Sequence, residues 1–164
     1  MRAHDVMTPN PAFCLIDDSV RRAAELMVQA DCGAIPVVDR ADGDRVVGIV
    51  TDRDIAVRVV AKGMAFDTPV RQVMSGPPVT VWAEADVLEV ERLMGEQQLR
   101  RILVTDEARH LLGIVAQADL ARAAEKDQIR GEQVAGVVER ISEPSVMADR
   151  EVRRTATPET PPPA

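Results

Sequence analysis

The stretch of sequence that decides the fold reads Gly48-Ile49-Val50-Thr51-Asp52-Arg53-Asp54. It places a hydroxyl at the end of an apolar run and a carboxylate three residues later. A second version, Gly113-Ile114-Val115-Ala116-Gln117-Ala118-Asp119, follows after an interval of 65 residues (119 minus 54). Self-similarity at a fixed interval indicates a repeated structural unit. We therefore expect one small unit that is used twice.

The first repeat contains the signals of a helix, a hairpin and a second helix. Residues 17–19 offer helix caps, and apolar residues then recur with helical spacing up to Met27, before Gly33. Residues 35–38 and 46–50 are short apolar runs joined by a turn-rich stretch, which predicts two strands of a hairpin. Thr51 is a candidate cap for a helix to about Val60.

The second repeat follows the same order. Val73-Met74-Ser75 repeats Val6-Met7-Thr8 at an offset of 67 residues (73 minus 6), and the offset falls to 65 within the hairpin turn. Insertions belong in surface turns, so this change supports the alignment. We expect a helix around residues 87–94, strands at 102–104 and 111–115, and a last helix from Gln117 to about Glu125.

These boundaries divide the chain into four parts. Repeat one spans residues 1–66 and repeat two spans 67–128. Residues 129–146 carry apolar side chains with helical spacing and predict a short docking helix, although two glycines weaken it. Residues 147–164 are polar and rich in proline, which predicts a disordered tail.

Composition excludes several classes of protein. The chain has 164 residues with 20 basic and 27 acidic side chains, and its net charge of -7 disfavours nucleic acid and anionic membranes. Neither a signal peptide nor a transmembrane run is present in the sequence, which predicts a cytoplasmic protein. Cys14 and Cys32 lack a metal or redox motif and are expected to be buried, reduced thiols.

The motifs resemble those of the CBS-domain pair, or Bateman module, named after cystathionine beta-synthase. The resemblance covers residues 1–128 and rests on Val6-Met7-Thr8-Pro9, Ile35-Pro36-Val37-Val38-Asp39, residues 47–55 and their counterparts in repeat two. It implies an α/β protein of the α+β type, in which each repeat is a small sheet with two helices. The two repeats are expected to pack about a pseudo-twofold axis and to leave two clefts for adenosine nucleotides.

Thr51 and Asp54 have two interpretations. Thr at a cap with an acidic residue at the third helical position approximates a capping box, which is purely structural. In the functional interpretation, unpaired amides at the helix start and the Thr51 hydroxyl bind a phosphate, while Asp54 accepts the hydroxyls of a ribose. The resemblance implies this ribose role for Asp54. Gly48 and Gly113 predict either a bulge or a close neighbour, such as a ligand.

Three arginines are candidate phosphate ligands. Arg53 near the helix start is unfavourable to the helix dipole unless an anion lies between them. Arg100 and Arg101 precede the strand at residues 102–104, and guanidinium groups bind phosphate in bidentate fashion. Solvated surface arginines remain the alternative in each case.

The resemblance also implies which residues share a cleft. One cleft is expected to combine Thr51, Arg53 and Asp54 with Val79, Arg100 and Arg101. The other retains Asp119, but Ala116 replaces the hydroxyl and Gly33 and Ala34 replace the arginines. The chain has few aromatic residues, so aliphatic side chains are expected to contact the base, and the candidates are Ala12, Ile35, Pro36, Val79 and Ile102.

The expected function is a regulatory sensor that binds AMP, ADP or ATP and acts in trans on an unknown partner. It requires no cofactor, and His4 and His110 lie in no metal or catalytic motif. Alternatives are a ligand-free structural or interaction module, a sensor of S-adenosylmethionine or of a dinucleotide, and a small hydrolase, against which the missing catalytic set argues. We also expect a homodimer, because Val134, Val137, Val138 and Ile141 lie outside the repeats and need cover.

Overall fold

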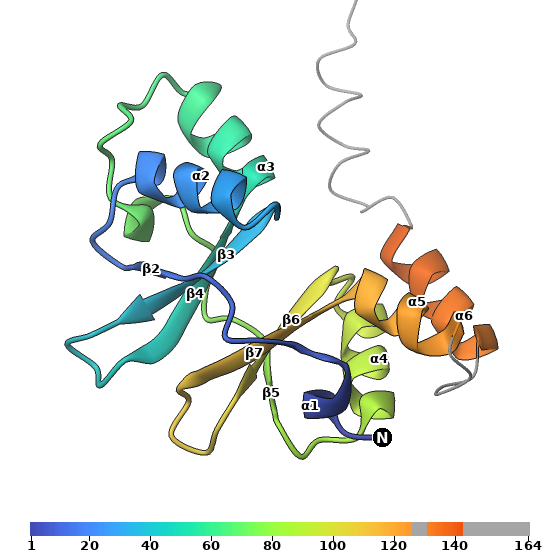
Figure 1. Ribbon diagram of the computed structural model, residues 1–164. Helices are drawn as coiled ribbons and strands as arrows, with labels where there is room; N and C mark the ends of the chain where they lie inside the picture. Colours follow the sequence, from blue (N-terminus) through green and yellow to red (C-terminus); the bar gives the residue numbers. More distant parts are fainter. Residues whose placement is uncertain (126–130, 143–164) are drawn as a thin grey trace, which may run out of the picture.

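The computed structural model describes residues 1–125 and 131–142, which form two small sheets, each covered by helices on one face (Figure 1). The elements of the first half are α1 (Ala3–Val6), β1 (Thr8–Pro9), β2 (Cys14–Leu15), α2 (Val20–Gln29), β3 (Ala34–Asp39), β4 (Arg45–Thr51), α3 (Asp52–Asp54) and the helix η1 (Ile55–Val60). The elements of the second half are η2 (Val70–Gln72), β5 (Thr80–Trp82), α4 (Val87–Glu96), β6 (Arg101–Thr105), β7 (Leu111–Ala116), α5 (Gln117–Glu125) and α6 (Gly131–Ser142).

The predicted elements of each repeat are present. Ser19 caps α2, because its hydroxyl accepts a hydrogen bond from the Arg22 amide at 3.2 Å. The apolar residues of α2 that were expected on one face include Val20, Ala23 and Met27, and all three are buried. The mixed α/β class is therefore confirmed, with two sheets that each pair a hairpin with helices.

The helix after Thr51 has a feature that the sequence did not predict. After one α-helical turn it widens to a π-helix over Ile55–Val60, where the Ala61 amide donates to the Ala56 carbonyl at 3.0 Å. Its counterpart α5 is a regular α-helix. Single π-turns within helices are frequent at functional sites.

The two sheets exchange their leading segments. The strand order is β2-β3-β4 in one sheet and β1-β7-β6-β5 in the other, so β1 from the start of the chain belongs to the sheet of repeat two. Thr8 pairs with Ile114, and in the symmetric position Ser75 pairs with Ile49. In Figure 1 the dark-blue α1 lies beside α4. We call residues 1–9 the N-terminal segment and residues 69–75 the crossing segment.

Gly48 and Gly113 allow this exchange. The Met74 sulfur lies 2.5 Å from the position that a Cβ atom would occupy on Gly48, and the Ser75 carbonyl oxygen lies 3.0 Å from it. The Met7 sulfur covers Gly113 in the same way. A register shift also follows each glycine, since the pairs Val37↔Gly48 and Val104↔Gly113 both precede one. Both expected explanations therefore apply, and the close neighbour is a methionine of an exchanged segment.

Each sheet builds its core with the other repeat's leading segment. Val70 and Val73 of the crossing segment are fully buried in the core of repeat one. Ala3 of the N-terminal segment is fully buried in the core of repeat two. Each packed unit of sheet and helices therefore contains most of one sequence repeat and the leading segment of the other.

Helix α6 completes the core of repeat two, and its packing corrects one expectation. Val134, Val137 and Ile141 are buried in that core with 5%, 1% and 6% of their surface exposed, and α6 packs against α4 and α5. The assumption that these residues need a second subunit as cover is therefore wrong. The rest of the expected docking segment and the tail lie outside the described residues.

Across residues 1–125 and 131–142, we find no helix of the length and apolarity that crossing a membrane requires.

The first prediction concerns Gly48. A Cβ atom at this position meets the Met74 sulfur and the Ser75 backbone, so Gly48→Ala is expected to destabilise the protein by about 1–3 kcal/mol. Chemical denaturation measures the change. The matched control is Gly136→Ala in α6, where nothing lies within 4 Å and the loss of glycine is expected to stabilise by about 1 kcal/mol. Equal effects of the two substitutions contradict the close-approach explanation.

A second prediction concerns Glu91 of α4, which is only 4% exposed. Among the described residues its Oε1 atom has no hydrogen-bond partner, and burial raises the pKa of this carboxyl, helped by the charge of Asp86. The folded state therefore favours the protonated form, and the cost of the charge appears as pH rises through the raised pKa.

Glu91→Gln should consequently stabilise the protein at pH 7 by on the order of 1 kcal/mol. The advantage should shrink as pH falls from the raised pKa toward 4.5, the ordinary pKa of the carboxyl, and be lost below 4.5, because Glu91 is then protonated in both states. Thermal unfolding across pH measures this difference. Glu89→Gln on the exposed face of the same helix is the control, and an equal gain from it rules out burial as the cause.

Candidate functional site

We call residues 48–54 motif one, and its last four residues form a closed hydrogen-bonded pair of side chains, Thr51 and Asp54. The Thr51 hydroxyl donates to Asp54 Oδ2 at 2.7 Å, and the Thr51 amide donates to the same oxygen at 3.0 Å. In return, the Asp54 amide donates to the Thr51 hydroxyl oxygen at 3.1 Å. This is a reciprocal capping box. The only hydroxyl hydrogen of Thr51 is therefore already in use.

The amides at this helix start are also paired, which corrects the expected phosphate site. The Asp52 amide donates to the Gly33 carbonyl at 3.1 Å, and the Arg53 amide donates to Asp52 Oδ1 at 2.7 Å. With the Asp54 amide bound to Thr51, the first three amides all have acceptors. The prediction that free amides bind a phosphate here is wrong. Charged side chains have to supply that role.

The Arg101 side chain of repeat two lies beside motif one, whereas Arg100 lies at the start of α5, where its carbonyl accepts from the Gln117 amide at 3.1 Å. The Arg101 guanidinium lies 3.6 Å from the position of a Cβ atom on Gly33, and the Asp52 carboxylate is 2.7 Å from the same point. Arg101 of repeat two thus reaches the start of motif one in repeat one. Within the described part of the chain, Arg53, Arg100 and Arg101 form no ion pair, although the Asp52 carboxylate lies near Arg101.

Asp54 has one further partner that sequence analysis missed. Its Oδ1 atom forms an ion pair with Arg58 Nη2 at 3.4 Å, and only 14% of the Asp54 side chain is exposed. An arginine four residues after an aspartate on a helix is a recognisable pairing signal. The spacing was visible in the sequence and could have identified Arg58.

The corresponding residues of repeat two, which we call motif two, form a simpler arrangement. The Ala116 amide donates to Asp119 Oδ2 at 2.7 Å, but alanine supplies no hydroxyl. Asp119 Oδ1 pairs with Arg122 of α5, and the Asp119 side chain is only 8% exposed. Motif two therefore has a less accessible carboxylate and one polar group fewer.

The apolar residues expected to contact a base occupy different environments. The Ile35 side chain is 0% exposed in the core of repeat one, as is Ile102 in the core of repeat two, so only their backbone atoms can face a ligand. Ala34 and Pro36 alternate with Ile35 and lie on the other face of β3, where they too are buried. The expectation that the Ile35 side chain lines a cleft is therefore wrong.

The two remaining apolar candidates lie at sheet edges. Ala12 is half-buried and packs against the core of repeat one. Val79 is half-buried next to β5, and its carbonyl accepts from the Leu103 amide at 3.4 Å. No hydrogen bond within the described residues joins either of them to motif one. Their place in a shared cleft stays a prediction.

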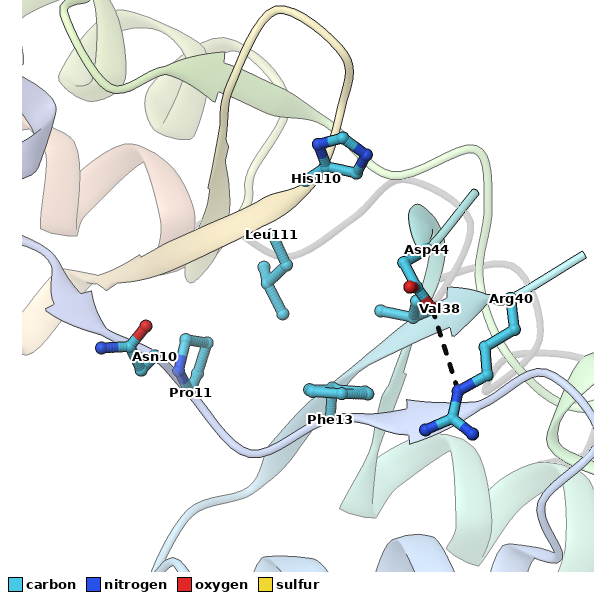
Figure 2. Close-up of a pocket in the computed structure, with 8 residues that line it drawn as sticks. All are labelled: Asn10, Pro11, Phe13, Val38, Arg40, Asp44, His110 and Leu111. Carbon is cyan, nitrogen blue, oxygen red and sulfur yellow. Dashed lines mark ion pairs between the residues drawn. The ribbon is translucent and has the colours of Figure 1, made fainter. Parts of the chain in front are cut away.

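A cavity of about 610 Å³ lies at the opposite end of the β3–β4 hairpin from motif one (Figure 2). Its apolar wall consists of Pro11, Phe13, Val38 and Leu111, and its polar rim consists of Asn10, Arg40, Asp44 and His110. Along the hairpin Ala34 pairs with Thr51 and Asp39 pairs with Arg45, so the cavity is a full strand length away from motif one. None of the predicted ligand residues lines it.

The cations of this cavity are already paired. Arg40 faces Asp44 at 3.8 Å, and the ring of His110 is 2.8 Å from Asp106. Hydrogen bonding and charge attraction raise the pKa of His110 and lower the pKa of Asp106. The volume suits a small ligand, since such pockets span roughly 300–1,000 Å³. A phosphate finds no unpaired cation at this rim, in contrast to motif one.

Metal and thiol chemistry have little support in the described residues. No group of three or more His, Cys, Asp or Glu side chains among them is arranged to hold a metal ion. Cys14 and Cys32 are free, and burial raises the pKa of the Cys14 thiol to about 12, which makes it unreactive. Cys14 is buried as predicted, while Cys32 is half-buried.

Comparison with known proteins identifies the family. The model of the CBS domain matches residues 3–61 and residues 70–126. The chain is 40% identical over 135 residues to the uncharacterized protein YlbB of Bacillus subtilis, which covers 82% of this chain and 90% of that protein. The chain therefore belongs to the CBS domain family and contains two CBS domains in tandem.

The fold is similar to two solved structures that contain bound groups. The structure of CBSX2 in complex with AMP has a TM-score of 0.67 and 28% identity, and covers 78% of this chain and 98% of that one. Hypoxic Response Protein I with two coordinated zinc ions has a TM-score of 0.67 and 32% identity, covering 74% and 98%. These ligands are properties of those two proteins.

Proposed function

We propose that this chain is a regulatory sensor that binds an adenine nucleotide, AMP, ADP or ATP, at motif one. The observation that carries the proposal is the meeting of Arg101 from repeat two with Asp52 and the start of motif one from repeat one. Asp54, which accepts the ribose hydroxyls in this proposal, follows Asp52 by two residues, and Arg101 has no ion-pair partner among the described residues. The AMP complex of CBSX2 supports the same ligand class.

Each end of the nucleotide has a chemically suited partner. Carboxylates accept hydrogen bonds from hydroxyls, and Asp54 is the partly exposed carboxylate of motif one, with 14% of its side chain exposed. Arg53, Arg100 and Arg101 supply planar donors for phosphate, which they bind more strongly than neutral groups do. The ligand bridges the two repeats, so its occupancy changes the free energy of their relative arrangement.

The two motifs are unequal in this proposal. Motif two has an alanine in place of Thr51, and Gly33 and Ala34 of repeat one stand where repeat two has its arginine pair. Arg101 pairs with Ala116 in the β6–β7 ladder, but its guanidinium reaches toward Gly33 of repeat one, so a nucleotide at motif two has fewer phosphate donors in this proposal. One dominant site per chain follows.

The sensor has no chemistry of its own in this proposal and acts in trans on a partner that reads its shape. The motifs contain no nucleophile, base or metal set arranged for turnover within the described residues. The free, unreactive Cys14 fits a reducing compartment such as the cytoplasm. S-adenosylmethionine or a dinucleotide is the alternative ligand, and a ligand-free interaction module is the alternative function.

The homodimer is part of the same proposal, with an interface on repeat one. An apolar groove of about 340 Å³ lies between α2 and η1, with Phe66 and Val60 at its edge 63% and 67% exposed. Helices α4 and α5 are the counterparts of α2 and η1, and α6 covers that face in repeat two. The groove of repeat one is the uncovered equivalent, and a second copy brings the same apolar surface to it.

Binding predictions follow for isothermal calorimetry on the purified chain. Asp54→Asn should weaken AMP binding by about tenfold or more, since a hydrogen bond to a charged group contributes roughly 1.5–3 kcal/mol. Arg101→Ala should weaken ADP and ATP more than adenosine, because only the phosphates lose a partner.

Asp119→Asn in motif two is the matched control and should change the heat little. Equal losses from Asp54→Asn and Asp119→Asn contradict the unequal sites. If AMP, ADP, ATP and adenosine all give no heat with the folded wild-type chain, the nucleotide function is wrong.

Light scattering at tens of micromolar protein tests the dimer. This concentration detects any dimer with a dissociation constant of about 1 μM or below. Wild type should be dimeric, and Phe66→Glu should be monomeric because it places a charge in the apolar interface. Trp82→Glu is the control, since Trp82 is 58% exposed in repeat two, away from the groove. A wild-type monomer with and without nucleotide excludes the dimer.

A further inference from the structure

Arg58 joins motif one to the crossing segment. Its Nη1 atom donates to the Val73 carbonyl at 2.6 Å and to the Met74 carbonyl at 3.0 Å. Its Nη2 atom donates to the Ser75 hydroxyl at 3.2 Å and pairs with Asp54 at 3.4 Å. One guanidinium therefore contacts the carboxylate of the motif and three consecutive residues that lead into repeat two.

Arg58 and a ligand diol compete for the same acceptor position on Asp54. An ionised carboxylate offers about four acceptor positions, two on each oxygen. Thr51 fills both positions of Oδ2 with its amide and hydroxyl, and Arg58 takes one side of Oδ1. A single hydroxyl can still bind to Oδ1. A diol with two donors needs the position that Arg58 holds.

The start of the crossing segment is held to repeat one by two backbone hydrogen bonds, from the Val70 amide to the Asp18 carbonyl at 2.8 Å and from the Arg71 amide to the Ile16 carbonyl at 3.1 Å, and its end is held separately. The Ile49 and Ser75 residues exchange two hydrogen bonds, each of 2.9 Å, and Met74 lies over Gly48. The Arg58 contacts lie immediately beside this isolated bridge. A change in the position of Arg58 therefore acts on the point where the chain leaves repeat one.

Repeat two has no equivalent connection. The residue that corresponds to Arg58 at the 65-residue offset is Ala123, which is buried. Asp119 pairs instead with Arg122, whose side chain is 62% exposed, and the described hydrogen bonds do not link Arg122 to the N-terminal segment. The regular α5 also lacks the π-turn that carries Arg58 in η1. The connection is specific to the motif with the intact Thr51.

We infer that Arg58 is a positioning residue that transmits the state of Asp54 to the crossing segment. With Asp54 free, the ion pair holds Arg58 against the Val73 and Met74 carbonyls. A ligand diol on Asp54 competes for Arg58's position and weakens its hold on residues 73–75. By linkage, a looser crossing segment in turn favours the ligand. The ligand step rests on the proposed function, whereas the Asp54–Arg58–segment connection does not.

The test is amide hydrogen exchange of Ile49 and Ser75, measured by NMR on the full chain. Arg58→Ala should raise exchange of both amides by about tenfold, because hydrogen bonds to a charged group are lost. Arg58→Lys should have a smaller effect, since a point charge replaces a planar fork. Asp54→Asn should raise exchange in the wild-type background and add nothing in the Arg58→Ala background. Saturating AMP should act like Asp54→Asn.

Arg122→Ala is the matched control, as it breaks the corresponding ion pair of motif two, and it should leave the exchange of Ile49 and Ser75 unchanged. If Arg58→Ala leaves both amides at their wild-type rates, or if Asp54→Asn has its full effect without Arg58, the inference is overturned. If AMP does not bind but the cycle between Asp54 and Arg58 shows coupling, the connection stands and only the proposed nucleotide function fails.

Discussion

The close approach of a methionine to a glycine within each sheet is the constraint on which the structure depends. Met74 lies over Gly48, and Met7 lies over Gly113 in the symmetric place. A side chain on either glycine would push the exchanged segment off the sheet. Because the exchanged segments contribute Ala3 and Val70 to the cores, both cores depend on this contact. The two repeats consequently form one folding unit rather than two independent domains.

The exchange also explains how a site in one repeat can affect the other. The chain passes from repeat one to repeat two through the crossing segment, next to the helix that carries Asp54. Arg58 contacts both the motif and this segment. In repeat two, Ala123 stands at the corresponding position, so the N-terminal segment has no such link to Asp119. A symmetric fold thus carries an asymmetric arrangement of charges.

Charge pairing distinguishes the cavity at the hairpin ends from motif one. At the cavity of the hairpin ends, Arg40 and His110 each face a carboxylate. Beside motif one, Arg101 approaches from the other repeat without an ion pair among the described residues. Phosphate binding requires an unneutralised cation, so the arginines near motif one are better suited to it than the paired cations of the cavity. Cavity volume alone points to the wrong end of the sheet for an anionic ligand.

The sequence by itself determined the duplication, the elements of each repeat and the family, because these are written in local patterns. The 65-residue interval, the cap at Ser19 and the pairing potential of Thr51 with Asp54 are all short-range features. Tertiary structure decided that Met74 fills the space above Gly48 and that α6 covers the core of repeat two. It also decided that the amides at the start of the helix after Thr51 are already hydrogen-bonded. Those outcomes depend on which distant segments meet, and no local pattern specifies which partner a glycine or an apolar face receives.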